Sequence, residues 1–267
     1  PKEGDDPMRR KINLEGDFEF FSGERFGSIL LLGLKRDFMF HVTNLSAKTI
    51  FFDYLDMVSQ NASLKVVVIL GSPGKTGRNE YKEFYTQVIQ TILDVSAVYK
   101  MFNAVDQLIL KIIEMNQIVI HADSGNVLPL FLNISLACDY RMVADNTLFQ
   151  NPCLEFGLVP KGGGAFFLTK RLGASKACEL LLSEDDITAE DALRLGLVDR
   201  VVALNDLRET VMKKAEEYAG KPARSLRCIK RLISFSLKEL YEYLEFETHE
   251  LTKMIGPFGD GLVKDNR

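Results

Sequence analysis

Residues 121–164 read HADSGNVLPLFLNISLACDYRMVADNTLFQNPCLEFGLVPKGGG, and they carry the strongest structural signals in the chain. An apolar strand runs into this segment, a turn follows at 123–125, and the apolar run 127–138 predicts a buried helix. The first N–H groups of a helix lack acceptors within the helix and carry partial positive charge. A strand, a turn and a helix in this order direct those groups at a ligand, so we expect the functional pocket at the start of this helix.

The composition limits the classes of protein that fit. With 267 residues, of which 46% are hydrophobic, the chain can form one large α/β domain or a domain with a helical appendage. A net charge of -4 argues against nucleic-acid binding. The four cysteines have no C-x-x-C spacing and indicate a reducing compartment. The three histidines lie far apart, so no metal site is expected.

Membrane and targeting signals are not expected either. The longest apolar run is short and is interrupted by Asn133. No signal peptide opens the sequence. These features predict a cytoplasmic protein without a membrane partner.

The flanking segments show the periodicities of both strands and helices. Apolar segments 18–21 and 28–34 around a turn at 22–24 predict a hairpin, and Ser46 is expected to cap a helix at 47–59. The apolar runs 65–70 and 117–122 predict buried strands. A glycine-rich loop at 71–79 and a long helical region at 80–115 lie between them. After the glycine cluster we expect a short strand at 197–202 and helices at 166–172, 175–182, 189–195, 207–219, 223–234 and 237–255.

The order of these segments resembles that of the enoyl-CoA hydratase/isomerase superfamily, also called the crotonase superfamily. The similarity covers about 28–251, and its segments are VVVILG (66–71), KEF (82–84), LACDYRMVAD (136–145), LEFGLVPKGGG (154–164), RLG (171–173) and ITAEDALRLGLVDRVV (187–202). The resemblance implies an α/β fold, a crotonase-like spiral of ββα units with a C-terminal helical region. It also implies a homotrimer or hexamer and an acyl-CoA thioester ligand, with coenzyme A as part of the substrate and no other cofactor.

This resemblance divides the chain into three parts. We expect a flexible N-terminal segment at 1–15, a crotonase-like β/α core at 16–203, and a C-terminal helical trimerisation region at 204–267.

In this family two backbone N–H groups hold the thioester oxygen while an enolate forms beside the carbonyl. By position, the resemblance implies that these donors are Asn79, in RNEYKEF, and Leu130, in LPLF. The family usually has three glycines where this chain has Pro129, Leu130 and Phe131. Glycine permits close approach of a ligand to the backbone, so the larger side chains predict a narrower pocket or a donor pair that does not form.

The acid/base positions depart further from the family. Asn133 and Cys153 stand where hydratases have two glutamates, and asparagine can neither take nor deliver a proton. Ordinary hydratase chemistry is therefore not expected. Cys153 can transfer a proton only if its pKa falls toward neutral, and the alternative is a packed, inert thiol. Glu155 shares a face with Cys153 if the segment is a strand, and the alternative is a surface carboxylate.

Further polar side chains are candidate ligands of the substrate. Tyr81 is a candidate donor with packing as its alternative, and His41 lies where the resemblance places coenzyme A, with a surface position as its alternative. His121 is expected to be a hydrogen-bonded core residue, and Asp123 is expected to cap its turn. Pro129, Phe131 and Asn133 complete the expected substrate-binding set.

Two classes of function follow from the sequence. The first is an acyl-CoA enzyme that isomerises, decarboxylates or cleaves a thioester substrate. The second is a catalytically silent acyl-CoA binder or structural subunit with the same fold. A phosphate site at 162–164 is disfavoured, because the cluster lacks the G-x-x-x-x-G-K-[ST] order.

Overall fold

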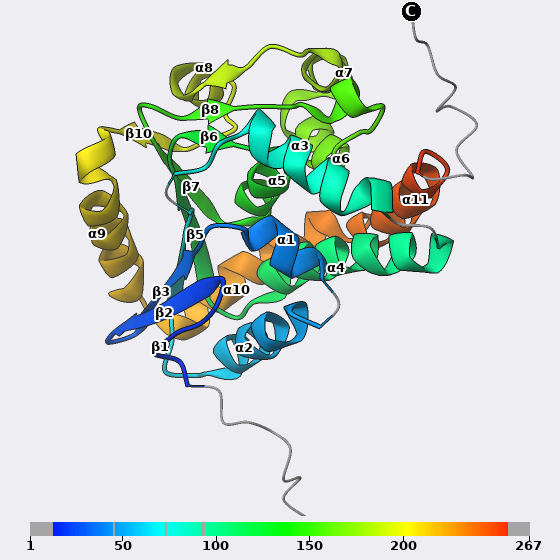
Figure 1. Ribbon diagram of the computed structural model, residues 1–267. Coiled ribbons are helices and arrows are strands. Elements are labelled where there is room, and N and C mark those ends of the chain that lie inside the picture. Colours follow the sequence, from blue (N-terminus) through cyan, green and yellow to red (C-terminus); the bar gives the residue numbers. More distant parts are fainter. Residues whose placement is uncertain (1–12, 45, 73, 92–93, 256–267) are drawn as a thin grey trace, which may run out of the picture.

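The computed structural model describes residues 13–44, 46–72, 74–91 and 94–255. Most of the segment expected to be flexible, 1–15, lies outside these residues, so that expectation stays a prediction. Among the described residues, seven strands form the central sheet in the order β1-β2-β3-β4-β5-β7-β10 (Figure 1). Their bounds are Gly16–Asp17 (β1), Phe21–Phe26 (β2), Ile29–Leu34 (β3), Val66–Leu70 (β4), Ile118–Asp123 (β5), Tyr140–Ala144 (β7) and Arg200–Val202 (β10).

In the central sheet, β3, β4, β5, β7 and β10 run parallel to one another. The buried strands predicted at 65–70 and 117–122 are β4 and β5. Val67 of β4 pairs with Leu30 of β3 on one side and with Val119 of β5 on the other. β7 pairs with β5 and with β10. A smaller sheet has the order β6-β8-β9. Its bounds are Asn126–Val127 (β6), Leu148–Phe149 (β8) and Ile187–Thr188 (β9).

Helices cover both faces of the central sheet. The α-helices are Phe38–Thr43 (α1), Lys48–Gln60 (α2), Arg78–Gln87 (α3), Val95–Glu114 (α4), Pro129–Ala137 (α5), Gly164–Leu172 (α6), Ala174–Leu182 (α7), Ala189–Arg194 (α8), Leu207–Ala219 (α9), Ala223–Ser234 (α10) and Leu240–Thr252 (α11). Short 3-10 turns are Ile89–Thr91, Cys153–Phe156, Leu204–Asp206 and Phe235–Leu237. Figure 1 shows α9 on one side of the sheet and most other helices on the opposite side.

The side chains of the parallel strands alternate between two cores, as the two-residue period of a strand requires. Val66 and Val68 face the core that contains Val211 of α9. Val67 and Ile69 face the larger core under the other helices. Burial on both faces explains why these strands read as unbroken apolar runs. The expected boundary at 203/204 falls just before α9, which shares the smaller core with the sheet.

The order strand, strand, helix recurs along the chain, in agreement with the expected spiral of ββα units. β5 is followed by β6 and α5, and β7 is followed by β8 and α6. Each pair contributes one strand to the central sheet and one to the smaller sheet.

Four local predictions were wrong. The segment 22–24 lies inside β2, where a side chain on Gly23 would meet the Tyr54 hydroxyl, and the hairpin turns at Gly27 instead. Ser46 does not cap α2 through its side chain; Asn44 Oδ1 instead accepts the Ser46 N–H at 2.9 Å.

The other two errors concern missed element boundaries. The region 80–115 divides into α3 and α4, because the Asp94 carboxylate accepts the Ser96 N–H at 3.0 Å and starts a new helix. The segment after Cys138 turns into β7, which fills the gap between β5 and β10.

The core position of Leu108 gives a test of this packing. Leu108 is 1% exposed in the larger core, whereas Leu182 is 67% exposed. We expect Leu108→Ala to lower the free energy of unfolding by about 2–5 kcal/mol and Leu182→Ala to change it by less than about 0.5 kcal/mol. Urea denaturation measures both. Equal losses in the two variants would contradict the packing.

Candidate active site

The two expected donors occupy equivalent positions in two helices. Asn79 is the second residue of α3 and Leu130 the second residue of α5. N–H groups at this position have no acceptor in their own helix. The first helical bonds at each start are Tyr81 N–H to the Gly77 carbonyl, at 3.1 Å, and Leu132 N–H to the Leu128 carbonyl, at 3.0 Å.

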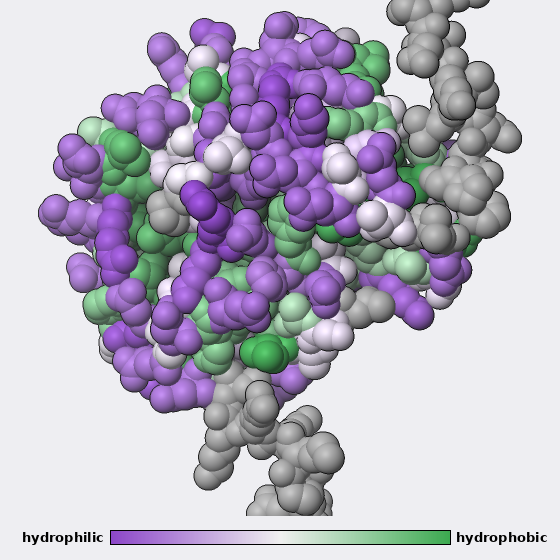
Figure 2. Space-filling view, in the orientation of Figure 1, coloured by the Kyte–Doolittle hydropathy of each residue, from purple (hydrophilic) through white to green (hydrophobic). Residues whose placement is uncertain are grey.

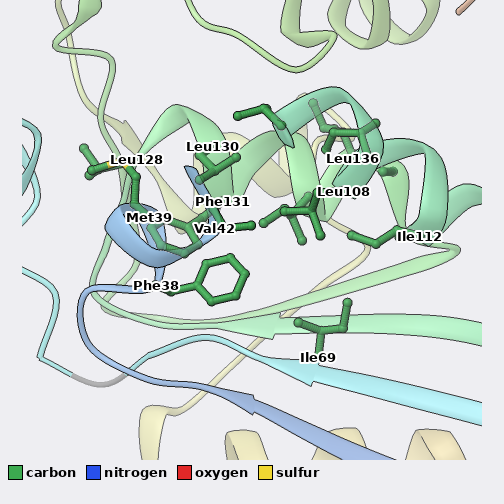
Figure 3. Packing of buried hydrophobic residues seen from close by; sticks show 14 of the residues in the cluster. Phe38, Met39, Val42, Ile69, Leu108, Ile112, Leu128, Leu130, Phe131 and Leu136 are labelled. Atoms are coloured by element: carbon green, nitrogen blue, oxygen red, sulfur yellow. The ribbon is translucent and has the colours of Figure 1, made fainter. Parts of the chain in front are cut away.

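A pocket lies at the start of α5, where the sequence placed it. It measures about 620 Å³ when its opening to solvent is included. Four of the predicted site residues line it: Tyr81, Pro129, Leu130 and Cys153. Apolar side chains make up most of the rest, namely Met39, Phe84, Ile89, Met101, Phe102, Val105, Leu128, Leu158, Val159, Pro160, Leu251 and Ile255, with Thr43 and Lys161 as the other polar members. Figure 3 shows Met39 and Val42 of α1 close to Leu130 and Phe131 at the start of α5.

Tyr81 and Cys153 form a hydrogen-bonded pair in this pocket. Both side chains are buried. Burial raises the pKa of Cys153 to about 12 and that of Tyr81 well above its ordinary value. Both groups therefore stay protonated at neutral pH, which favours the packed thiol over a proton-transferring one.

Glu155 does not share a face with Cys153, because this segment is a 3-10 turn and not a strand. Its carboxylate points away and forms an ion pair with Arg78. Arg78 also binds Asp186 at 2.9 Å. Of the two alternatives left open for Glu155, this geometry agrees with the surface carboxylate, and Glu155 is not in the described lining of the pocket. The three charges join the start of α3 to the loop before β9.

Asn133 supports the glycine cluster. Its Nδ2 donates to the Lys161 carbonyl at 3.0 Å, and a side chain on Gly164 would meet Asn133 at 3.1 Å. It lines a neighbouring pocket, together with Leu132 and Leu168, and not the pocket at Tyr81 and Cys153. Asn133 is therefore not part of the described lining of the pocket at Tyr81 and Cys153, although Pro129 lines both pockets.

Three other candidates also lie apart from the described lining of the pocket. The Phe131 ring is buried under the Lys75 ammonium, 4.9 Å from its centroid. The His41 ring stacks on Phe20 with centroids 4.8 Å apart. Asn79 is exposed, and α3 reaches the pocket through Tyr81 and Phe84.

A buried ion pair between Lys75 and Asp123 fixes the glycine loop before α3. The Asp123 carboxylate also accepts the Ser124 N–H at 2.8 Å, as its predicted capping role requires. A side chain at Gly71 would collide with this carboxylate, so only glycine fits there. His121 lies beside the pair, 3.9 Å from Asp123.

His121 is buried as predicted, but its expected hydrogen bonds are absent. Within the described parts of the chain, neither ring nitrogen has a hydrogen-bond partner. Burial lowers its pKa to about 4, so the imidazole stays neutral near pH 7 and carries no charge into the core.

A second buried charge cluster was not predicted. Lys161 pairs with Asp106 of α4 and, at 2.8 Å, with Glu247 of α11. Thr248 donates to Asp106 at 3.0 Å, and the Gly162 N–H donates to Glu247 at 3.0 Å. Desolvation raises the pKa of Asp106 to about 6, although Lys161 opposes this shift.

The sequence held a signal for this cluster. Asp106 stands on the apolar face of α4, four residues after Phe102, and Glu247 stands between Leu244 and Leu251 on the apolar face of α11. Charged residues at core positions of a helix need a buried partner. Lys161, directly before the glycine cluster, is that partner.

The described residues show neither a metal site nor a membrane span. They contain no group of three or more His, Cys, Asp or Glu side chains suited to a metal ion. None of the described helices is both long and apolar enough to cross a bilayer.

Comparison with solved structures defines the class of fold. An enoyl-CoA hydratase from Bacillus halodurans superposes with a TM-score of 0.75 at 20% identity, over 88% of this chain and 95% of that one. A probable enoyl-CoA hydratase/isomerase from Mycobacterium abscessus gives 0.69 at 25% identity, over 87% and 89%. The fold is that of the crotonases, as the sequence predicted.

Residues 41–256 match the family model for enoyl-CoA hydratase/isomerase, and the chain belongs to that family. It is 26% identical to a trans-2-decenoyl-[acyl-carrier-protein] isomerase of Streptococcus mutans, over 63% of this chain and 65% of the relative. It is 34% identical to a crotonyl-CoA hydratase of Syntrophomonas wolfei, over 48% and 50%. The matched part thus spans about half to two thirds of the length of these relatives.

The shifted pKa of Asp106 predicts an unusual pH dependence of stability. Its pKa is about 6 in the folded protein, against an ordinary value of 3.8, so the folded state holds this proton more tightly. The resulting stabilisation is complete below about pH 4 and is lost as the pH rises through 6. The stability of the wild type relative to Asp106→Asn should therefore fall between pH 4 and 7, by up to about 3 kcal/mol.

Urea denaturation at each pH measures this difference. Asp53→Asn is the matched control, because Asp53 is an exposed aspartate on α2 and its substitution should leave the pH dependence unchanged. A relative stability that stays constant or rises with pH would contradict the assignment.

Proposed function

We propose that this protein binds an acyl thioester of coenzyme A and moves a double bond in its acyl chain by way of an enolate. The observation that carries the proposal is the apolar pocket at the start of α5, where the Leu130 N–H has no acceptor in its own helix. Such an N–H group in a site shielded from water stabilises the charge that develops on a thioester oxygen.

Isomerisation fits this pocket better than hydration does. Hydration needs a water molecule held between an acid and a base. Asn133 instead binds the Lys161 carbonyl, and the Cys153 thiol is buried with a raised pKa. Shifting a double bond needs only one group that takes and returns a proton. The S. mutans relative, named an isomerase of trans-2-decenoyl-[acyl-carrier-protein], supports this choice.

The walls favour an unbranched apolar acyl chain. Met39, Met101, Phe102 and Leu251 line the pocket, and methionine side chains adapt to flexible apolar ligands. The second candidate function is silent acyl-CoA binding. This alternative is favoured by the position of Asn79, the second expected donor. Asn79 is exposed and is not among the described residues that line the pocket.

We also propose that the chain assembles with copies of itself, as a trimer or hexamer, through α10. The face shown in Figure 2 is mostly hydrophilic. On α10, in contrast, Ile229, Leu232 and Ile233 share one helix face and are 53%, 71% and 65% exposed. Exposed apolar groups of this kind commonly mark protein interfaces.

The proposed donor can be tested by removing a single N–H group. Leu130→Pro deletes the N–H in the first turn of α5, where proline is tolerated; Leu130→Ala retains it. In the presence of acyl-CoA, we expect exchange of the α-proton with deuterated solvent to fall 10²–10³-fold in Leu130→Pro and to persist in Leu130→Ala. Mass spectrometry of the recovered thioester measures the exchange.

Calorimetry with the same thioesters, and with free coenzyme A as the control, separates the candidate functions. Binding without exchange in the wild type would favour the silent binder. No binding of any thioester would refute both candidates.

Assembly has its own test. We expect Leu232→Asp to convert the assembly to monomers, because a charge at this exposed apolar position would have to be desolvated in the interface. Arg224→Asp, at the start of the same helix, is the control. Light scattering after size-exclusion chromatography measures the mass, and a monomeric wild type would contradict the proposal.

A further inference from the structure

The buried cluster around Lys161 lies against the wall of the acyl pocket. Lys161 lines the pocket, and its ammonium lies 5.8 Å from the ring centroid of Phe102, which lines it too. Asp106 directly follows the lining residue Val105 on α4, and Glu247 stands one turn before the lining residue Leu251 on α11. The lysine therefore connects the pocket to two carboxylates just behind its wall.

The two carboxylates have different environments. Glu247 receives hydrogen bonds from Lys161 at 2.8 Å, from the Gly162 N–H at 3.0 Å and from the Gly163 N–H at 3.1 Å, and it is also bonded to the Tyr243 hydroxyl. These donors hold the Glu247 carboxylate in one orientation beside Lys161.

Asp106 has fewer donors, Lys161 and the Thr248 hydroxyl. Few donors compensate for the burial of this carboxylate, so Asp106 is suited to accept a proton. The raised pKa of Asp106 agrees with this role.

We propose that Lys161 is the acid/base residue of the pocket, with Glu247 as its positioning residue and Asp106 as the acceptor that holds its proton. This assignment rests on the proposed function and supplies the group that Asn133 and Cys153 do not provide. Among the described residues that line the pocket, the other side chains that titrate are Tyr81 and Cys153, which bond to each other.

The chemistry balances within the cluster. An ammonium proton of Lys161 moves to Asp106, which leaves a neutral amine and no change in net charge. The amine takes a proton from the carbon next to the thioester carbonyl: the C–H bond breaks, an N–H bond forms, and the electron pair moves onto the carbonyl oxygen at the Leu130 N–H. Return of the proton to the γ-carbon breaks that N–H bond, forms the new C–H bond and restores the carbonyl. No oxidant, reductant or further reactant is needed.

Lys161→Arg is the decisive variant. Arginine keeps a positive charge between Asp106 and Glu247, so the fold is retained, but it does not lose its proton in proteins. We expect this variant to bind acyl-CoA within about threefold of the wild type and to exchange the α-proton 10²–10⁴-fold more slowly. Lys170→Arg, an exposed lysine of α6 paired with Glu239, is the matched control and should exchange at the wild-type rate.

Chemical rescue gives a second, independent measurement. In Lys161→Ala, added methylamine should restore exchange in proportion to its concentration, because a small amine can take the vacated place. If Lys161→Ala does not fold, the arginine variant decides the matter alone.

The pH dependence of proton exchange tests the role of Asp106. Within the described part of the chain, the charged and titratable groups around Lys161 are Asp106 from α4, Glu247 from α11 and, through Glu247, the Tyr243 hydroxyl. Exchange by the wild type should rise with pH as Asp106 ionises. In Asp106→Asn the rate should fall at least tenfold and this rise should vanish, whereas a merely structural role would lower the rate at every pH alike.

The outcomes separate this inference from the proposed function. A wild type that exchanges the α-proton, with Lys161→Arg exchanging equally fast, would overturn the assignment and leave the proposed function intact. A wild type that binds no thioester or exchanges no proton would overturn both.

Discussion

Burial of β5 on both faces is the constraint on which the rest of the site depends. Val119 faces the larger core and Ile120 the smaller one, so the strand cannot shift by one residue without placing apolar side chains on the wrong side. With β5 fixed between β4 and β7, the chain must leave the sheet at Asp123. The turn, β6 and the start of α5 follow within six residues. The position of the Leu130 N–H is thus set by sheet packing.

Buried charges join the remaining parts of the site to this frame. Lys75 and Asp123 fix the loop before α3, and Lys161 joins α4 and α11 beside the pocket. Buried ion pairs often add little net stability, because desolvation of the charges offsets their attraction. Breaking one by removing a single partner is costly, so such pairs fix one arrangement of the elements that carry them. In this protein they hold the two loops from which α3 and α6 begin.

The sequence predicted the parts of the structure that depend on periodic apolar segments. β4, β5 and α5 appear where their apolar runs predicted them, and the pocket lies at the start of α5. Elements that depend on partners far along the chain were missed. β7 has only five residues and is stabilised by β5 and β10, and the ion pair of Glu155 with Arg78 joins residues 77 positions apart.

The pairing of Lys161 with Asp106 and Glu247 joins residues 55 and 86 positions apart, and no local pattern gives such a pairing. Each carboxylate alone was visible as a charge on an apolar helix face. Only the fold shows that the two share one lysine.

The proposed function requires that a thioester carbonyl is polarised in the pocket at the start of α5. Carbon-13 NMR of an acyl-CoA labelled at the carbonyl carbon measures this directly, because hydrogen bonds to the oxygen move the carbonyl resonance downfield. We expect a downfield shift on binding to the wild type and to Leu130→Ala, and a smaller shift in Leu130→Pro. A bound thioester whose carbonyl resonance stays at its value in water would contradict the proposed function.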